Sequence, residues 1–586
     1  MAKFNIIELH IKDGILTNLH QKSEAEQNAL AVKNAIYIYR GSKSQKLYIG
    51  QTIHFLDRHR QHYSGNEEKF NTAEFDQVMV IFSKYFNRSA LDDVESQLIT
   101  YFTADNSYAS TNNIRYDTDE VINQTSGNSV NEYTERAQVA SEVILPLWEH
   151  VLFPKGWVNT PTLDVIRTSA LVKYSPIKEL TIEQQALINE IVQNPHKNYI
   201  INGDAGTGKT VLLTHLVALL LKSTEELRIG VVVQPNWEKT GADIFKLYGM
   251  NNSRLSVLTS TKLITKGEHY DIIIVDESHK MSRRYNKQHP SFNRVYEIKG
   301  FEKCNSHLEI IQQMGSQIIL MYDVLQAIRP ANITRAMFQE LTAGYERKFL
   351  TTQFRIQTPA GKNYTSDDYI NGIKYLLYKD TGLLNTGLTK FNPDFNRELF
   401  SDVGSDAYFG YYTDQPLHHL IAWLEEDNNY NPEHVNRVLA GLVEDWKQSD
   451  GRNPYITHWE EGDIKRRWNS TQENWINSHD ADAEQQIGSV FAVQGIDLNK
   501  VGVLIGNDLE VNNNNQLIAN PDHFYNTNGT FTVSEMESTE NQTEFTLFVL
   551  NIYYVLLTRG IDGIRLGFWK NDAFIKYMED TLDIHH

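Results

Sequence analysis

Several features that define other classes of protein are scarce in this sequence. Cys304 is the single cysteine among 586 residues, which excludes intrachain disulfides and a cysteine-rich zinc site and fits a reducing compartment. No apolar run approaches the length of a membrane span. The N-terminal stretch MAKFNIIELHIKDG lacks the continuous apolar segment of a secretory signal. We therefore expect a cytoplasmic protein that does not act at a membrane and that forms about two to four domains.

An excess of basic residues is also missing. The formal net charge is −19, which argues against a protein that coats nucleic acid through its overall field. Residues 31–70 differ from the rest of the chain, because they hold seven Lys or Arg against three Asp or Glu, a local balance of +4. Such a basic stretch favours a local contact with a phosphate backbone.

The segment 203–210 reads GDAGTGKT and matches the pattern G-x-x-x-x-G-K-[S/T]. The apolar residues 199–201 before it predict a strand, and the apolar residues 211–221 after it predict a helix. In this context glycine backbone and a helix N-terminus can approach a triphosphate, whereas a plain Gly-rich turn would not need these flanks. The segment therefore predicts ATP binding through Gly203, Gly206, Gly208, Lys209 at the β- and γ-phosphates, and Thr210 at magnesium.

Two further apolar runs end in polar side chains. Residues 271–275 predict a strand buried on both faces, and it ends at Asp276 and Glu277. In an α/β sheet such carboxyl ends meet the ligand, so we expect Asp276 to hold magnesium and Glu277 to orient or deprotonate the attacking water. Residues 318–325 predict another such strand, followed by Gln326, which is placed to sense the γ-phosphate.

These segments stand in a set with LTIEQ at 180–184, LTTQFR at 350–355, VQG at 493–495 and YVLLTRG at 554–560. In this order they resemble the motifs of superfamily 1 helicases and, more specifically, the Schlafen-group-3-like DNA/RNA helicase domain over residues 171–586. The resemblance implies two RecA-like lobes with ATP between them. It also implies that Gln184 reads the adenine edge and that Arg355 and Arg559 are arginine fingers. Residues 229–240 match the strand-contacting motif only loosely, so ATP hydrolysis is better supported than unwinding.

The first 115 residues contain the features of a second candidate catalytic site. Residues 35–37 and 47–50 predict a hairpin that leads into a helix, on which Arg58 and His62 share one face. An apolar stripe follows at 91, 94, 98, 99 and 102, and Glu95 lies within it. We expect Asp92, Asp93, Ser96 and Gln97 on the polar side. A carboxylate on a mostly buried face needs a partner, and a metal ion is one candidate.

Residues 33–115 resemble the GIY-YIG endonuclease family, with Ala35 in place of the first motif glycine. The resemblance implies phosphodiester hydrolysis with one divalent ion, Mg²⁺ or Mn²⁺, held by Glu95. Either Tyr37 or Tyr48 would take the proton from water, and Arg58 would stabilise the charge on phosphorus. The residues that match the family are Tyr37, Tyr48, Arg58, His62, Glu95 and Asn112, with Asn113 as the competing asparagine.

The predicted fold class is α/β, with a small GIY-YIG nuclease domain followed by two RecA-like parallel-sheet lobes with insertions. We expect the nuclease-like domain at 1–120, a connector at 121–170, lobe one at 171–345 and lobe two at 346–586. Residues 358–480 read as insertions, and 507–545 as a long surface loop.

The predicted function is an ATP-dependent nuclease–helicase that acts on nucleic acid, with DNA ahead of RNA. The pairing of a nuclease with a motor suggests restriction or antiviral defence. Two alternatives stay open: a nucleotide-gated nucleic-acid-binding switch without cleavage, and a GIY-YIG fold that binds without cutting. The sequence leaves the oligomeric state and any protein partner open.

Overall fold

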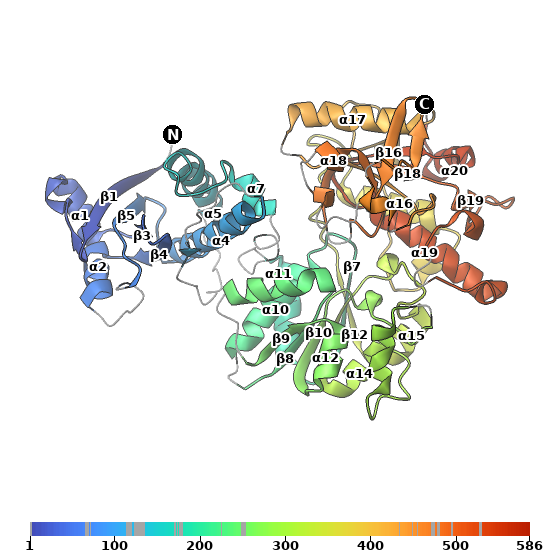
Figure 1. Ribbon diagram of the computed structural model, residues 1–586, viewed down its shortest axis with the longest axis horizontal. Helices are drawn as coiled ribbons and strands as arrows, with labels where there is room; N and C mark the ends of the chain where they lie inside the picture. Colours follow the sequence, from blue (N-terminus) through green and yellow to red (C-terminus); the bar gives the residue numbers. More distant parts are fainter. Residues whose placement is uncertain are drawn as a thin grey trace. The chain divides into compact units, whose positions relative to one another are not determined.

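The structure is a computed structural model (Figure 1). It describes the whole chain except residues 1–2, 65–69, 71, 113–119, 122–134, 169–171, 173, 175–179, 224–225, 248–252, 287, 433, 448, 454, 470–474, 478–480, 494–495, 527–529 and 586. The chain divides into two compact units. The first contains 1–185, 210–227 and 235–257, and the second contains 186–209, 228–234 and 258–586.

The first unit contains a six-stranded sheet in the order β2-β1-β5-β3-β4-β6. The predicted hairpin is confirmed, because β3 and β4 pair antiparallel with Tyr37 opposite Gly50. The helix α2 (Phe55–Ser64) follows, and it carries both Arg58 and His62 as predicted. The strand bounds are β1 (Phe4–Lys12), β2 (Ile15–Leu16), β3 (Ala35–Gly41), β4 (Lys46–Thr52), β5 (Gln77–Ser83) and β6 (Glu120–Val121).

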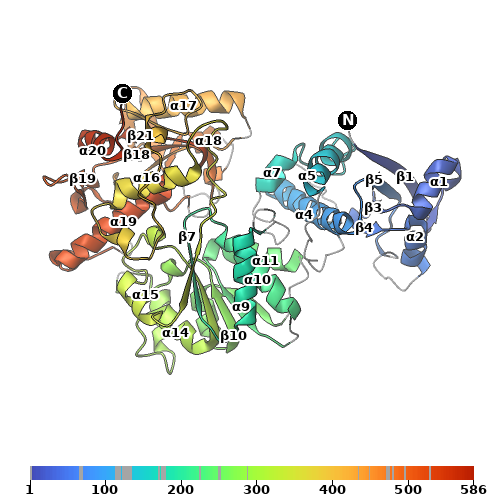
Figure 2. The same cartoon turned by 180° about the vertical axis from the view of Figure 1, so that it is seen from behind.

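The long helix α4 (Arg88–Asn112) packs against β4 in this unit (Figures 1 and 2). The predicted apolar stripe is confirmed, since its five members are at most 1% exposed. The prediction of an exposed polar side is wrong for three of its residues, because Asp93, Ser96 and Gln97 are also buried. The reason is tertiary, because α5 (Arg136–Val139) and α7 (Leu163–Thr168) cover that side of α4 and Arg136 pairs with Asp93 at 3.2 Å.

The other helices of the first unit follow ordinary local rules. Ser23 and Glu26 form a capping box at the start of α1. Trp148 is fully buried and its indole N–H donates to the carbonyl of Thr160. The bounds are α1 (Glu24–Val32), α6 (Leu145–Leu147), α9 (Ile182–Gln193, which continues into the second unit), α10 (Lys209–Ser223) and α11 (Pro235–Leu247).

The nucleotide-binding strands lie in a sheet with the order β12-β7-β11-β10-β8-β9. Strands β7, β8, β10, β11 and β12 pair in parallel, as the alternating pattern predicted. Because parallel strands end at one edge, this register brings the segments after β7, β10, β11 and β12 to that edge. The bounds are β7 (Tyr199–Gly203), β8 (Ile229–Val232), β9 (Leu255–Leu258), β10 (Tyr270–Val275), β11 (Gly315–Tyr322) and β12 (Glu346–Leu350).

The second unit also contains a seven-stranded sheet in the order β13-β21-β18-β14-β17-β16-β15. Neighbouring strands in this sheet pair in parallel, except β15 and β16, which are antiparallel. The fold class is therefore confirmed as a small α/β domain with two RecA-like parallel sheets. The bounds are β13 (Phe409–Tyr412), β14 (Arg437–Ala440), β15 (Trp459–Glu461), β16 (Ile464–Trp468), β17 (Gln486–Gly488), β18 (Leu498–Ile505) and β21 (Gly560–Phe568).

Two expectations about this part of the chain are wrong. Residues 358–480 supply strands β13, β14, β15 and β16 of the sheet itself, because apolar positions hidden among Tyr, Trp and Asn are buried there. Residues 507–545 contain the hairpin β19 (Leu509–Val511)–β20 (Leu517–Ala519) and the first turns of α19 (Thr539–Leu557). The domain boundaries stay a prediction.

Two buried helices of the second unit bear on the site. Thr365 and Asp368 form a capping box that starts α16 (Ser366–Tyr378). Helix α16 packs on α19, and both views show the two side by side (Figures 1 and 2). None of the helices in the described parts of the chain is long and apolar enough to cross a membrane. The remaining helices are α12 (Ser260–Lys266), α13 (Pro290–Asn293), α14 (His307–Met314), α15 (Arg335–Leu341), α17 (Pro416–Tyr430), α18 (Ala481–Glu484) and α20 (Asp572–Leu582).

Candidate nucleotide and nuclease sites

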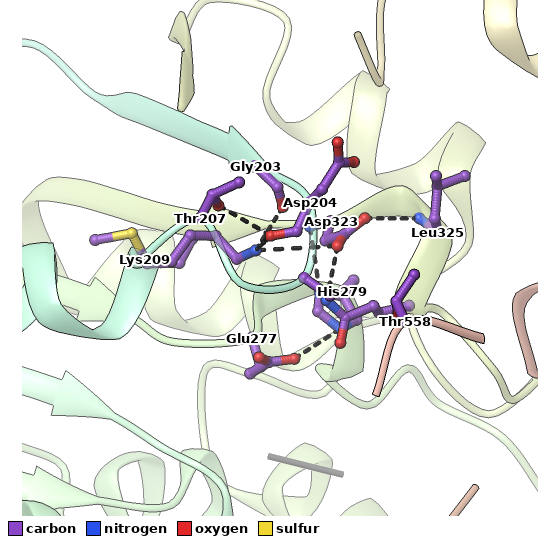
Figure 3. Close-up of polar contacts among 12 residues, drawn as sticks. Gly203, Asp204, Thr207, Lys209, Glu277, His279, Asp323, Leu325 and Thr558 are labelled. Atoms are coloured by element: carbon purple, nitrogen blue, oxygen red, sulfur yellow. Dashed lines mark hydrogen bonds and ion pairs between the residues drawn. The ribbon is translucent and has the colours of Figure 1, made fainter. Parts of the chain in front are cut away.

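The phosphate loop, residues 203–208, joins β7 to α10. Gly206 and Gly208 have φ of +86° and +79°, which is the left-handed region that favours glycine. The Lys209 amine is 7% exposed and donates to the carbonyls of Gly203 and Asp204 (Figure 3). Thr207 also donates to the carbonyl of Asp204, at 2.9 Å. The loop therefore curls around the Lys209 amine, which is the group expected to meet phosphate.

Asp276 and Glu277 follow β10, as predicted. Burial, reinforced by the charge of Glu277, raises the pKa of Asp276 to about 7. Burial by itself would raise the pKa of Glu277 as well, but the Lys280 ammonium and His279 hold it well below its usual range. Lys280 lies 2.8 Å from the Glu277 carboxylate. Glu277 also has φ of +52°, an uncommon conformation for a residue other than glycine and one that clusters at functional sites.

The sequence motifs do not single out His279, which lies beside Glu277. Its Nδ1 accepts the backbone N–H of Asp323 at 3.3 Å, so the ring hydrogen is on Nε2, which lies 2.9 Å from the Glu277 carboxylate (Figure 3). The ring is fully buried, and burial lowers its pKa. His279 thus connects the end of β10 to the end of β11.

The sequence motifs also do not single out Asp323, which directly follows β11. It lies 3.9 Å from the Lys209 amine, and burial raises its pKa. The Gln326 amide donates to its carboxylate at 2.7 Å, and the side chain of Gln326 is buried. Gln326 thus bonds Asp323, and the Asp323 carboxylate lies near the Lys209 amine. A polar residue directly after a buried strand was the signal in the sequence.

The segment after β12 closes over the phosphate loop. Leu350 pairs with Gly203, so the chain beyond it continues directly along the loop. The Gln353 amide donates to the carbonyl of Ala205 at 2.8 Å, and the Phe354 N–H donates to the carbonyl of Gly206 at 3.0 Å. A Cβ at Gly206 would come within 2.8 Å of the Arg355 Cβ. This packing places Arg355 beside the loop.

The two predicted arginine fingers differ in their surroundings. Arg355 pairs with Asp497 and donates to the carbonyl of Thr558 at 3.3 Å. Arg559 is 2% exposed and donates to the carbonyls of Val555 and Ile496. Gln184 is buried, and its side-chain oxygen accepts the N–H of Thr181 at the start of α9. Thr210 is the second residue of α10. In the motif at 493–495, residues Gln494 and Gly495 lie outside the described residues.

In the first unit, Tyr37, Tyr48 and His62 converge. The Tyr37 hydroxyl lies 3.0 Å from His62 Nε2, and burial raises the pKa of this phenol above its usual value. The rings of Tyr37 and Tyr48 are stacked with centroids 6.3 Å apart. A Cβ at Gly50 would come within 2.5 Å of the Tyr37 ring, so this strand position requires glycine. The sequence did not predict that Tyr39 pairs with His59 at 2.7 Å in the same way.

Glu95 and Asp92 meet at one amide group. The Gln51 amide donates to Glu95 at 3.0 Å and to Asp92 at 2.5 Å. Burial, together with the Asp92 charge, raises the pKa of Glu95 to about 7 against the opposing Gln51 hydrogen bond. Arg58 on α2 lies close enough to lower the pKa of both Glu95 and Tyr37.

This donor set fits a divalent cation. Two carboxylates that share one amide donor are oxygen ligands of the kind that Mg²⁺ and Mn²⁺ prefer. Within the part of the chain that the structure describes, no group of three or more His, Cys, Asp or Glu side chains is close enough to hold a metal ion. Asn112 ends α4 and its side chain is outside the description, as is Asn113 altogether.

A parallel-sheet nucleotide site and a tyrosine–histidine–glutamate site together define a helicase-like protein with a nuclease-like domain. Two family models match the chain. Residues 196–569 match the Schlafen group 3, DNA/RNA helicase domain, and residues 33–109 match the GIY-YIG catalytic domain. Since the first match covers more than half of the 586 residues, the chain belongs to the Schlafen group 3 helicase family. Both predicted resemblances are confirmed.

Among curated proteins, the chain is 24% identical to the uncharacterized protein YPL245W of Saccharomyces cerevisiae, over 68% of this chain and 90% of that protein. Among solved structures, it is similar to Bacteroides sp Pif1 in complex with ADP-AlF4, with 14% identity, 69% and 96% of the two chains covered, and a TM-score of 0.27. It is also similar to the Pyrococcus furiosus Hef helicase domain, with 10% identity, 70% and 98% covered, and a TM-score of 0.29.

Proposed function

We propose that this protein hydrolyses ATP to drive movement along nucleic acid and cleaves phosphodiester bonds with its N-terminal domain. The closure of residues 353–355 over the phosphate loop carries the ATPase half of the proposal. It brings Arg355, which we assign to lobe two, beside the phosphate loop. The Lys209 amine of this loop is bonded to backbone carbonyl oxygens. An arginine at this place can stabilise charge on the γ-phosphoryl group as it transfers.

The acids after β10 supply the proton chemistry. Glu277 stays ionised because Lys280 and His279 offset its burial, so it can accept a proton from the attacking water. His279, whose Nε2 lies 2.9 Å from the Glu277 carboxylate, would help to keep that carboxylate in place. When ATP binds, we expect Lys209 to leave the loop carbonyls for the β- and γ-phosphates. Asp323, 3.9 Å from that amine, would guide the exchange.

Asp276 and Thr210 would hold the magnesium ion that accompanies ATP. The buried carboxylate of Asp276, with its pKa raised to about 7, is a hard oxygen ligand that a nearby divalent charge would keep ionised. The ion would neutralise phosphate charge.

In the nuclease domain, Tyr37 is the better supported base of the two tyrosines. Its hydroxyl meets His62 Nε2, which can receive the phenolic proton as the phenolic oxygen takes one from water. Arg58 would stabilise the phosphate charge. Glu95, with Asp92 beside it, would hold a Mg²⁺ or Mn²⁺ ion that polarises the scissile phosphate. The local basic stretch supports nucleic acid as substrate, DNA ahead of RNA, in the cytoplasm, where antiviral defence would use both activities.

The test combines both sites in one assay. Purified wild-type protein is incubated with labelled single- and double-stranded DNA and RNA, with and without ATP and Mg²⁺ or Mn²⁺. The matched variants are Lys209→Ala and Glu277→Gln for the ATPase, and Glu95→Ala and Tyr37→Phe against Tyr48→Phe for the nuclease.

We expect Glu277→Gln to bind nucleotide without turnover and Lys209→Ala to bind it weakly, because the amide cannot accept a proton and the lost amine faces phosphate. Glu95→Ala should stop cleavage and leave ATP turnover intact. Wild-type turnover in Glu277→Gln would refute the ATPase site. Cleavage that survives a chelator or Glu95→Ala would refute the nuclease site, and no cleavage of any substrate would favour the binding switch.

A further inference from the structure

One lysine of the second lobe is buried against the phosphate loop. Lys374 lies in the middle of α16 and is 1% exposed. A lysine is almost never this buried without partners, since its ammonium must replace its hydration with hydrogen bonds. Its Nζ donates to the Asp204 carboxylate at 2.7 Å and to the carbonyl of Lys390 at 2.6 Å. The partner that balances its charge is thus a side chain of the phosphate loop.

Asp204 is engaged from two sides. Its backbone carbonyl accepts the Lys209 amine at 3.0 Å, while its carboxylate accepts Lys374. The carboxylate points away from the Lys209 amine in Figure 3. If Lys209 moves toward phosphate, it releases the backbone carbonyl of Asp204, while the Asp204 carboxylate is bonded to Lys374. The second position of the GDAGTGKT segment therefore connects the nucleotide lysine to α16.

One turn further along α16, a second buried contact returns to the first lobe. Lys374 and Tyr378 are four residues apart and share a helix face. The Tyr378 hydroxyl donates to Asn551 of α19 at 2.7 Å. The Asn551 amide donates in turn to the carbonyls of Val324, at 3.1 Å, and Ala327, at 2.6 Å. Tyr378 and Asn551 are both at most 4% exposed.

The carbonyls of Val324 and Ala327 lie in the segment that directly follows Asp323. Two polar links therefore leave α16. Lys374 reaches Asp204 of the phosphate loop, and Tyr378 reaches, through Asn551, the segment that follows Asp323, whose carboxylate lies 3.9 Å from the Lys209 amine. Each internal group in these links has a partner, and a buried polar network of this kind holds one arrangement of its elements more strictly than apolar packing does. A change at either end must be accommodated at the other.

We propose that the buried network of Asp204, Lys374, Tyr378 and Asn551 couples the nucleotide state of the phosphate loop to lobe two, with Lys374 as its positioning residue. This inference rests on the proposed ATPase function. The network makes nucleotide binding and nucleic-acid binding depend on each other. By linkage, the factor by which nucleotide changes nucleic-acid affinity measures this coupling directly.

The experiment measures that factor. The affinity for fluorescein-labelled single-stranded oligodeoxythymidine is determined by anisotropy, with and without AMPPNP and Mg²⁺, in the full-length protein. The test variants are Lys374→Met, Asp204→Asn, their double mutant, and Tyr378→Phe. Lys379→Met and Tyr577→Phe are matched controls, because Lys379 bonds Thr581 and Tyr577 bonds the carbonyl of Leu376 outside the network. Thermal unfolding confirms that each variant folds.

A coupling factor of roughly 5 to 150 is typical of linked sites, and we expect Lys374→Met and Tyr378→Phe to reduce the wild-type factor by about fivefold or more. The double mutant should be no worse than Lys374→Met alone, since both remove one ion pair. Lys374→Arg should restore part of the factor. The two controls should keep it.

The outcomes separate the two claims. A wild-type protein without ATP turnover would refute the proposed ATPase and this inference with it. Normal wild-type turnover with an unchanged coupling factor in folded Lys374→Met and Tyr378→Phe would overturn the inference alone. An equal loss in the control variants would also overturn it, because the effect would then come from general weakening of α16.

Discussion

Substitution of Gly206 by alanine tests whether residues 353–355 pack on the phosphate loop. The Cβ of an alanine would lie 2.2 Å from the Gln353 side-chain oxygen and 2.8 Å from the Arg355 Cβ. The loop can accept it only if residues 353–355 move away. That movement breaks the two hydrogen bonds to Ala205 and Gly206, each with a net worth of about 1 kcal/mol.

Gly361 provides the matched control. Its φ of +85° is nearly the same as the +86° of Gly206, but a Cβ there has nothing within 4 Å. Both alanine variants therefore carry the same left-handed strain of about 1–2 kcal/mol. Only Gly206→Ala adds the displacement of residues 353–355. The difference in stability between the two variants therefore isolates this contact and should amount to about 2 kcal/mol.

The assay compares thermal unfolding, AMPPNP affinity and ATP turnover of the two variants. We expect Gly206→Ala to unfold at a lower temperature than Gly361→Ala and to lose most of its turnover, because Arg355 is displaced from the loop. Gly361→Ala should retain wild-type turnover. Equal unfolding temperatures together with normal turnover in Gly206→Ala would refute the closure of residues 353–355 over the loop.

Three further predictions follow from buried charges. Because the pKa of Glu95 is about 7 and only the carboxylate binds metal, Mn²⁺ affinity measured by EPR should rise about tenfold from pH 6 to pH 8. Glu95→Gln should abolish this pH dependence, and a flat wild-type profile would contradict the assignment. Arg355→Lys should lower kcat by orders of magnitude, up to roughly 10³, in single-turnover assays, since it loses the paired bonds to Asp497 and Thr558; normal turnover would exclude a role for the guanidinium. Arg136→Met should destabilise the first unit by about 3 kcal/mol, because Asp93 then stays buried without its ion pair. An unchanged midpoint of urea unfolding would disprove the role of this ion pair.

Local sequence determined the parts of this protein that depend on contiguous residues. The phosphate loop could be predicted because Gly206 and Gly208 adopt backbone conformations that glycine favours. The strand before Asp276 could be predicted because four apolar residues in a row, 272–275, fit a sheet buried on both faces. The GIY-YIG hairpin could be predicted because its two strands are close in the sequence, so that only a short turn is needed to pair Tyr37 with Gly50.

The tertiary structure decided what each polar side chain meets. Asp93 has the sequence environment of an exposed residue, yet Arg136, 43 residues further along, makes it a buried ion pair. Lys374 reads as an ordinary helix lysine, and only the packing of α16 on the phosphate loop, 170 residues earlier, gives it a charged partner. Periodicity reports which face of an element is apolar, but it holds no information on which distant segment covers the other face. Electrostatic partners across such distances are set by the arrangement of the sheets, and they decide which buried charges are tolerated.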